Sequence, residues 1–477
     1  MITEVPTTKL RTIIRVFGLI VGLFSLWQPA RAQELLTMPE VEPFATQEPF
    51  LPPPVVSQDN CAAVAKKDDI WTRPNFTGDW HGVRPALKDS GITFSGKLTQ
   101  FEFGLSGGIN KPTLPILGHG DTSAYTGRGQ YLAMLDLDKL FGVPKGKLLI
   151  QFEDWFGKYG NVSLGAGTFA PPVFSAFLPT APNDPGTPFL TNFLWLQPLS
   201  ERLIVFAGKR RVVGTFDQDI FAGGDGTDQF VNQVFNANPA FLLGLPFTSF
   251  GAGFKSPQEW GSFSGFIQDP TDRTTEYFQF DSMFSKGVIV GGELRLKTNF
   301  FNLPGEQHVG GVWKHVPETN LSFAEPPPGV YPQPVVPGFP TLNNSYTLYY
   351  GFDQYLVRYT KGDRGWGLFG HAAITDGNPN PVKYFLSTGI GGYSPFGQKR
   401  GDTFGAGWYL NGASTEFGPL PTALFGPRNG TGVELYYNFQ VTPSINVTPD
   451  IQFIRPGTGA IATDFAYAYG VRLNVRF

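Results

Sequence analysis

Cysteine is nearly absent from this sequence, since Cys61 is the only one among 477 residues. A single thiol cannot form an intrachain disulfide, and it has no partner for the paired spacing of a zinc site. Charged residues are also scarce, at 16% of the chain, whereas roughly 25% is usual in soluble domains. Their net charge of −3 provides no basic surface for a nucleic acid. We therefore expect no nucleic-acid partner.

Long apolar runs are missing as well. The longest near the N-terminus, Val16 to Leu26, is about half of the roughly 20 residues that a spanning helix needs. Basic residues precede this run, and Ala30-Arg31-Ala32 follows it with small residues at the positions that a signal peptidase reads. We predict a cleavable signal peptide over residues 1–32. The Pro-rich stretch that follows, residues 33–74, predicts a disordered or partly helical periplasmic leader.

Aromatic and turn-forming residues, by contrast, are abundant. Aromatics make up 15% of the chain, and 59 Gly and 42 Pro supply turns for many short strands. The C-terminal residues 465–477 alternate strictly, and side chains alternate faces along a strand. One face is therefore apolar and the other polar. The apolar face comprises Phe465, Tyr467, Tyr469, Val471, Leu473, Val475 and Phe477.

The same alternation recurs upstream with connections of two kinds. Residues 433–441 and 445–453 alternate and are separated only by Thr442-Pro443-Ser444, which predicts a tight hairpin. Longer connections flank this hairpin, as expected of outer-membrane barrels, with short periplasmic turns and long outer loops. The C-terminus then lies on the periplasmic side. Further alternating segments are residues 148–152, 202–209, 288–297, 346–359, 366–374 and 404–410.

The number of strands follows from length. Residues 75–477, at about 25 residues per strand and connection, would form about 16 strands. A closed barrel satisfies its backbone hydrogen bonds between strands and can therefore cross a membrane. We predict an all-β fold, a transmembrane antiparallel β-barrel with an aqueous lumen in a bacterial outer membrane. Expected partners are membrane lipid and, through the strand that ends in Phe477, the barrel-assembly machinery.

Inward residues on these strands follow from the alternation. On the last three strands the polar face carries Glu434, Tyr436, Asp450, Arg472 and Arg476, and the same reasoning selects Glu153 and Lys209 upstream. Polar inward groups can replace the hydration of a solute, and flat rings suit the C–H faces of a sugar. These seven residues are our candidates for the pore lining.

Short blocks that combine Gly, Asp and Asn with aromatic residues recur in order along the chain. They are Gly78-Asp79-Trp80 with Gly82, Arg84, Leu87 and Gly91-Ile92; Ala207-Gly208-Lys209, Phe216-Asp217, Phe230 to Asn232 and Phe235-Asn236-Ala237-Asn238; Gly367-Leu368-Phe369-Gly370 and Asp376 to Pro381; Tyr437-Asn438-Phe439, Val441-Thr442-Pro443, Thr448 to Gln452 and Gly470 to Phe477. Together they resemble the carbohydrate-selective porins of the OprB type. The resemblance implies a 16-stranded, monosaccharide-permeable porin. One departure is Lys209-Arg210-Arg211, where a single basic residue is expected.

Motifs that would indicate other functions lack their context. The glycines of Gly365 to Gly370 match a dinucleotide-binding pattern but sit inside an alternating strand, without the helix that would hold a phosphate. The loop that contains Asp225 and Asp228 resembles one turn of a calcium-binding repeat, and it has only one copy. These two carboxylates are the only metal-ligand candidates, and a plain acidic loop is the competing interpretation.

No catalytic motif is found among the five histidines. We therefore expect neither an enzyme nor a cofactor, and we name no catalytic residue. The sequence predicts passive diffusion of small solutes with a preference for monosaccharides such as glucose. The alternatives are a general or anion-favouring porin and an outer-membrane barrel enzyme.

Overall fold

The computed structural model describes residues 69–110, 123–157, 165–173, 188–212, 214–322, 340–359, 364–398 and 400–477. The predicted signal peptide, residues 1–32, lies outside the described residues, as does the predicted leader except for residues 69–74. Its strands are β1 (Ile92–Ile109), β2 (Ser123–Asp136), β3 (Lys147–Gly157), β4 (Phe189–Ser200), β5 (Leu203–Arg211), β6 (Thr248–Gln258), β7 (Gly261–Gln268), β8 (Val288–Phe300), β9 (Leu303–Thr319), β10 (Thr341–Arg358), β11 (Gly365–Thr375), β12 (Val382–Tyr393), β13 (Thr403–Ala413), β14 (Gly430–Thr442), β15 (Ile445–Arg455) and β16 (Ala462–Arg476).

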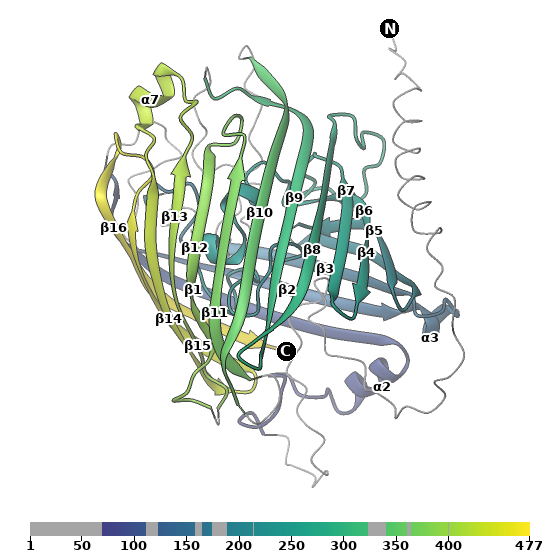
Figure 1. Ribbon diagram of the computed structural model, residues 1–477. Helices are drawn as coiled ribbons and strands as arrows, with labels where there is room; N and C mark the ends of the chain where they lie inside the picture. The colour runs from purple at the N-terminus through teal and green to yellow at the C-terminus, as the bar shows by residue number, and fades with distance from the viewer. Residues whose placement is uncertain are drawn as a thin grey trace. The chain divides into compact units, whose positions relative to one another are not determined.

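These strands form one closed antiparallel barrel (Figure 1). Each strand pairs with its neighbours in sequence, and β16 pairs with β1 to close the ring. The prediction of a 16-stranded barrel is therefore confirmed. Closure leaves no free sheet edge, so the strands satisfy their backbone groups among themselves.

Short helices occur in the connections. They are α2 (Val83–Asp89), α3 (Leu137–Phe141), α5 (Gln233–Asn236), α6 (Pro239–Leu242) and α7 (Pro419–Phe425). Among the described residues, none of the helices is both long enough and apolar enough to cross a bilayer.

The last three strands match the predicted alternation. On β16, Tyr469 and Val471 are 50% and 44% exposed, whereas the side chain of Arg472 is fully buried inside the barrel. The predicted hairpin is also present, because β14 ends at Thr442 and β15 begins at Ile445. The backbone N–H of Arg476 donates to the Ser444 carbonyl in this hairpin, so the C-terminus lies on the side of the short connections.

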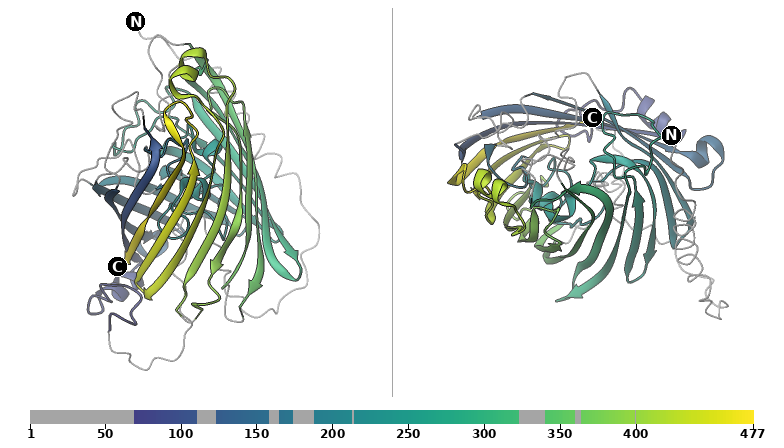
Figure 2. Two further views of the ribbon diagram at one scale, coloured as in Figure 1. Left: turned by 90° about the vertical axis from the view of Figure 1, so that its left-hand side faces the viewer. Right: turned by 90° about the horizontal axis from the view of Figure 1, so that it is seen from above.

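Connections on the opposite side are mostly longer, and the one between β5 and β6 folds into the barrel. Its residues 214–247 are mostly buried, and in the view from above the teal segment lies within the ring of strands (Figure 2, right). We call residues 214–247 the internal segment. It contains α5 and α6, whose first turns are capped by Asn232 and Asn238 through their side-chain oxygens.

Aromatic packing joins the internal segment to the wall. The Phe230 ring lies 5.4 Å from the Phe369 ring and 4.9 Å from the Tyr436 ring, and the Phe235 ring lies 5.9 Å from the Tyr409 ring. These edge-on contacts stabilise the segment against strands β11, β13 and β14. Because the barrel interior is thus partly filled by its own chain, the segment narrows the path through it.

Candidate functional site inside the barrel

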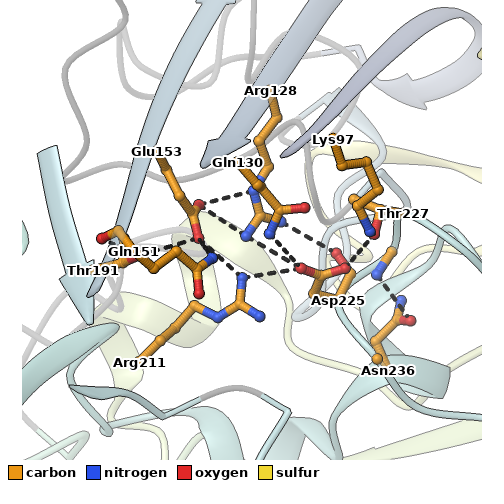
Figure 3. Close-up of polar contacts among 12 residues, drawn as sticks. Lys97, Arg128, Gln130, Gln151, Glu153, Thr191, Arg211, Asp225, Thr227 and Asn236 are labelled. Carbon is orange, nitrogen blue, oxygen red and sulfur yellow. Dashed lines mark hydrogen bonds and ion pairs between the residues drawn. The ribbon is translucent and has the colours of Figure 1, made fainter. Parts of the chain in front are cut away.

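Two arginines and two carboxylates meet where the internal segment approaches strands β2, β3 and β5 (Figure 3). Arg128 Nη2 lies 2.8 Å from Glu153 Oε2 and 3.3 Å from Asp225 Oδ2. Arg211 Nη1 lies 3.1 Å from Glu153 Oε1 and 2.9 Å from Asp225 Oδ2. Each cation thus bridges both anions. We call Arg128, Glu153, Arg211 and Asp225 the arginine cluster.

Polar and aromatic neighbours complete the surroundings of this cluster. The Gln130 side chain donates to Asp225 Oδ2 at 3.0 Å, and the Trp155 indole N–H donates to Glu153 Oε2 at 3.1 Å. The guanidinium of Arg128 also lies 4.9 Å from the centroid of the Trp155 ring. Cation–π contact and hydrogen bonding together restrain the cluster to one arrangement.

Charge pairing controls the ionisation of the acids that come from the internal segment. Burial by itself would raise the pKa of the Asp225 carboxyl. The cations Arg128, Lys97 and Arg211 outweigh burial and hold the pKa of Asp225 well below its usual range. Asp225 is therefore ionised at neutral pH.

Comparison with known proteins decides what kind of barrel this is. The family model described as "Carbohydrate-selective porin, OprB family" matches residues 120–477. The chain belongs to the OprB family of carbohydrate-selective porins. No match was found among curated proteins.

Solved porin structures support the fold of this OprB-family member. The high-pH structure of Pseudomonas putida OprB is 19% identical, with a TM-score of 0.71, and the match covers 85% of this chain and 99% of that one. The low-pH structure of the same porin is 17% identical with a TM-score of 0.50 and the same coverage of both chains. A porin is a channel, which confirms that the chain is not an enzyme, and its family and barrel fold indicate the outer membrane.

The predicted inward residues on the last three strands of this porin hold the internal segment. Glu434 accepts from the backbone N–H groups of Val231 and Asn232, at 2.5 and 3.0 Å. Arg472 donates to the carbonyls of Gly226 and Gln229, at 2.9 and 2.7 Å. These two side chains contact protein groups rather than open water.

The remaining candidates on these strands differ in exposure. Tyr436 packs against Phe230, and Asp450 is buried and accepts from the Gln452 side chain at 3.0 Å. Arg476 keeps 32% of its side chain exposed and reaches Asp228 of the internal segment at 3.1 Å. Of these three residues, Arg476 alone retains substantial access to solvent.

Of the two upstream candidates, Glu153 belongs to the arginine cluster inside the barrel, whereas the side chain of Lys209 lies on the outer side of the wall. Lys209 pairs in register with Phe193 and lies two residues from Ala207, which pairs with the outward-facing Trp195. Its ammonium donates to the Glu276 carbonyl in the connection between β7 and β8. The alternation therefore places Lys209 on the outer side of the wall, under that connection, and not on the pore lining.

The two acids of the proposed calcium loop bind basic side chains. Asp225 belongs to the arginine cluster, and Asp228 lies 2.6 Å from Lys97 Nζ and 3.1 Å from Arg476 Nη2. Calcium sites gather oxygen ligands around an ion whose charge the acids balance. Here cationic side chains already balance these acids, and the calcium prediction gains no support.

Arg128 and Arg211 were not among the predicted site residues. Arg211 belongs to the basic triplet that departs from the family pattern. This departure was the sequence feature that could have identified Arg211 as a site residue. The strand of Arg128 was not predicted, so its inward direction could not be read from alternation. Its meeting with Asp225 depends on an inward-folded connection, whose destination the sequence pattern does not encode.

Proposed function

We propose that this porin lets monosaccharides such as glucose diffuse passively across the outer membrane, past the arginine cluster. The supporting observation is the cluster's balanced charge, with two arginines facing two carboxylates at 2.8 to 3.3 Å. A neutral, hydroxyl-rich solute can exchange hydrogen bonds with such groups without the cost of burying a charge. Family membership supports sugars as the solute class.

The groups that reach the solute are the ones that keep some exposure. The Arg211 and Lys97 side chains are 14% and 17% exposed, and that of Asp228 is 23% exposed. Guanidinium and ammonium groups donate to sugar hydroxyls, and the carboxylate accepts from them. We propose these three, with Arg476, as the solute-contacting residues, and Glu153, Glu434 and Arg472 as the supports that position the internal segment.

An anion preference is the second candidate. Lys97 and Arg476 share the single carboxylate Asp228, so this neighbouring group carries one positive charge more than it has negative charges. That surplus favours anions among ions while leaving neutral sugars unaffected.

The test is conductance in a planar bilayer. We expect ion conductance from the purified porin, reduced more by added glucose than by serine at equal concentration. Arg211→Gln should weaken the glucose effect at least several-fold, because it removes a donor at the cluster. Arg202→Gln is the matched control, since it makes the same charge change at an exposed position in the turn between β4 and β5.

The response of the conductance to sugars and its ion selectivity distinguish the two candidates. Conductance that no sugar reduces, combined with a clear anion preference, would replace the sugar proposal with the anion-favouring porin. Absence of any conductance would contradict both.

Export and assembly are proposals of the same kind. We propose that residues 1–32 are removed on export, which mass spectrometry of the protein from outer membranes would test.

We also propose that the assembly machinery recognises the barrel through Phe477 and that the outer face of the barrel contacts lipid. Phe477 exchanges backbone hydrogen bonds with Gly96, where a Cβ would lie 2.3 Å from the Phe477 ring. If removal of Phe477 left assembly in cells unchanged, the assembly proposal would fail.

A further inference from the structure

Two histidines and two aspartates meet at a second place on the internal segment. His308 lies on β9 and His371 on β11, and both point into the barrel with 1% and 6% of their surface exposed. Asp217 and Asp219 come from the internal segment and are also buried. We call these four residues the histidine cluster.

The imidazole nitrogens converge on one oxygen. His308 Nε2 lies 3.2 Å and His371 Nε2 lies 3.9 Å from Asp217 Oδ1. The ligand atoms of Asp217, His308 and His371 all lie within 4.8 Å of one another. In a tetrahedral site with bonds of about 2.0 to 2.1 Å, neighbouring ligand atoms are about 3.3 Å apart. The three groups therefore need only small shifts to share one ion.

The other nitrogen of each ring faces a different polar group. His308 Nδ1 lies 3.5 Å from Asp219 Oδ1, and His371 Nδ1 lies 3.3 Å from the Ser387 hydroxyl. Metal-binding histidines characteristically engage a carboxylate or another polar group through the second nitrogen, which orients the ring and fixes its tautomer. His371 Nδ1 makes such a contact with Ser387, whereas His308 Nδ1 only lies near Asp219, without hydrogen-bond geometry. His308 Nε2 is directed at Asp217, and His371 Nε2 lies between Asp217 and the nearer Asp219.

Hydrogen bonding leaves part of the cluster unsatisfied. His371 Nε2 comes within 2.7 Å of Asp219 Oδ2. This ion pair apart, His308 Nδ1, His371 Nε2 and both Asp219 oxygens have no partner in hydrogen-bond geometry among the described residues. Buried polar atoms normally have partners, and those without one call for an explanation such as an ion.

Charge balance also favours a cation. Besides Asp217 and Asp219, Glu293 adjoins the cluster, where it accepts from the backbone N–H of Asp217 at 2.8 Å. Arg295 is the permanent cation beside it and is shared between Glu293 and Glu306. Protonation of both histidines would add positive charge, but it would place two imidazolium rings side by side, with centroids 5.9 Å apart. A metal ion adds the same two charges and attracts both nitrogens, so the rings no longer repel each other.

We propose that Asp217, His308 and His371 bind one divalent transition-metal ion of the Zn²⁺ or Co²⁺ class, with Asp219 beside them as a fourth ligand or as the partner of His308. Imidazole nitrogen with carboxylate oxygen suits these ions. Such an ion ties the internal segment to strands β9 and β11. Its role is structural and distinct from the proposed solute contacts.

The first experiment titrates the folded, chelator-treated porin with Co²⁺. We expect visible absorption bands of cobalt bound to nitrogen and oxygen, and about one ion retained per chain after dialysis. The double variant His308→Gln, His371→Gln should bind Co²⁺ at least 100-fold more weakly, since loss of second-shell partners alone typically costs 10 to 100-fold. His315→Gln is the matched control, because His315 is exposed and stacks on Trp313; its binding should be unchanged.

Absence of stoichiometric Co²⁺ binding would overturn the proposal, and so would binding that the double variant leaves intact. X-ray absorption at the zinc edge on the unmodified, Zn²⁺-loaded porin provides an answer even if the double variant does not fold. Two imidazole ligands per zinc support the site, whereas an oxygen-only shell contradicts it.

Discussion

The arginine cluster and the histidine cluster fasten the same internal segment to different parts of the wall. One uses strands β2, β3 and β5, and the other uses β9 and β11. The arginine cluster pairs two permanent cations with two anions and is neutral by itself. The histidine cluster has an excess of acid and depends on protons or a metal ion for balance. The first cluster suits a constant environment at a solute path, and the second suits an adjustable anchor.

We expect the largest loss of stability from a substitution that removes one anion of the arginine cluster. Glu153→Gln leaves Arg128 and Arg211 sharing only Asp225 in a buried site, so we expect a loss of about 3 kcal/mol in the free energy of unfolding. Denaturant unfolding in detergent micelles measures this loss. Glu416→Gln, an exposed position in the connection before β14, should change stability by less than about 0.5 kcal/mol. A loss below about 1 kcal/mol for Glu153→Gln would show that the cluster tolerates unbalanced charge.

Acid should weaken the arginine cluster next. The pKa of Asp225 lies well below its ordinary value of 3.8 in the folded porin. A carboxyl with a depressed folded pKa stabilises the fold above its unfolded pKa, and this contribution disappears as pH falls through the folded pKa. We therefore expect no change from this group between pH 7 and 5 and a decline below about pH 4. Asp225→Asn should show a shallower decline, and equal slopes for the two proteins would contradict the assignment.

We expect the smallest change in stability from the partly exposed ion pair of Lys97 and Asp228, which lies beside the arginine cluster. Lys97 and Asp228 are partly exposed and 2.6 Å apart, and Arg476 also pairs with Asp228. Lys97→Met should therefore cost no more than about 1 kcal/mol, and high salt should reduce the difference from the unmodified porin. Unfolding at low and high ionic strength checks this, and an effect independent of salt would place the pair in a drier environment than its exposure indicates.

Alternation predicted most of the wall but little of the interior. The strands from Gly430 to Arg476 were predictable because their outer residues are apolar and their inner residues polar, and Thr442-Pro443-Ser444 leaves only one turn between two of them. Lys209 was misplaced because its neighbours are Arg210 and Arg211, and three consecutive basic residues carry no alternation that could orient them.

The internal segment was not predictable for a different reason. Its Phe-rich and Asn-rich sequence is compatible with an outer loop as well as with an inward fold, since both pack aromatic rings and cap short helices. The decisive contacts, such as those of Asp225 with Arg128 and of Asp217 with His308, join residues far apart in the chain. Such pairings arise from the closed barrel and have no local signature.

Arg472 and Asn474 both donate to backbone carbonyls of the internal segment, and both lie on β16. Pairing of β16 with β1 closes the ring, and the same strand supplies these donors to the internal segment. One strand therefore both seals the wall and holds the segment that narrows the passage, so a change that displaced β16 would alter the wall and the passage together.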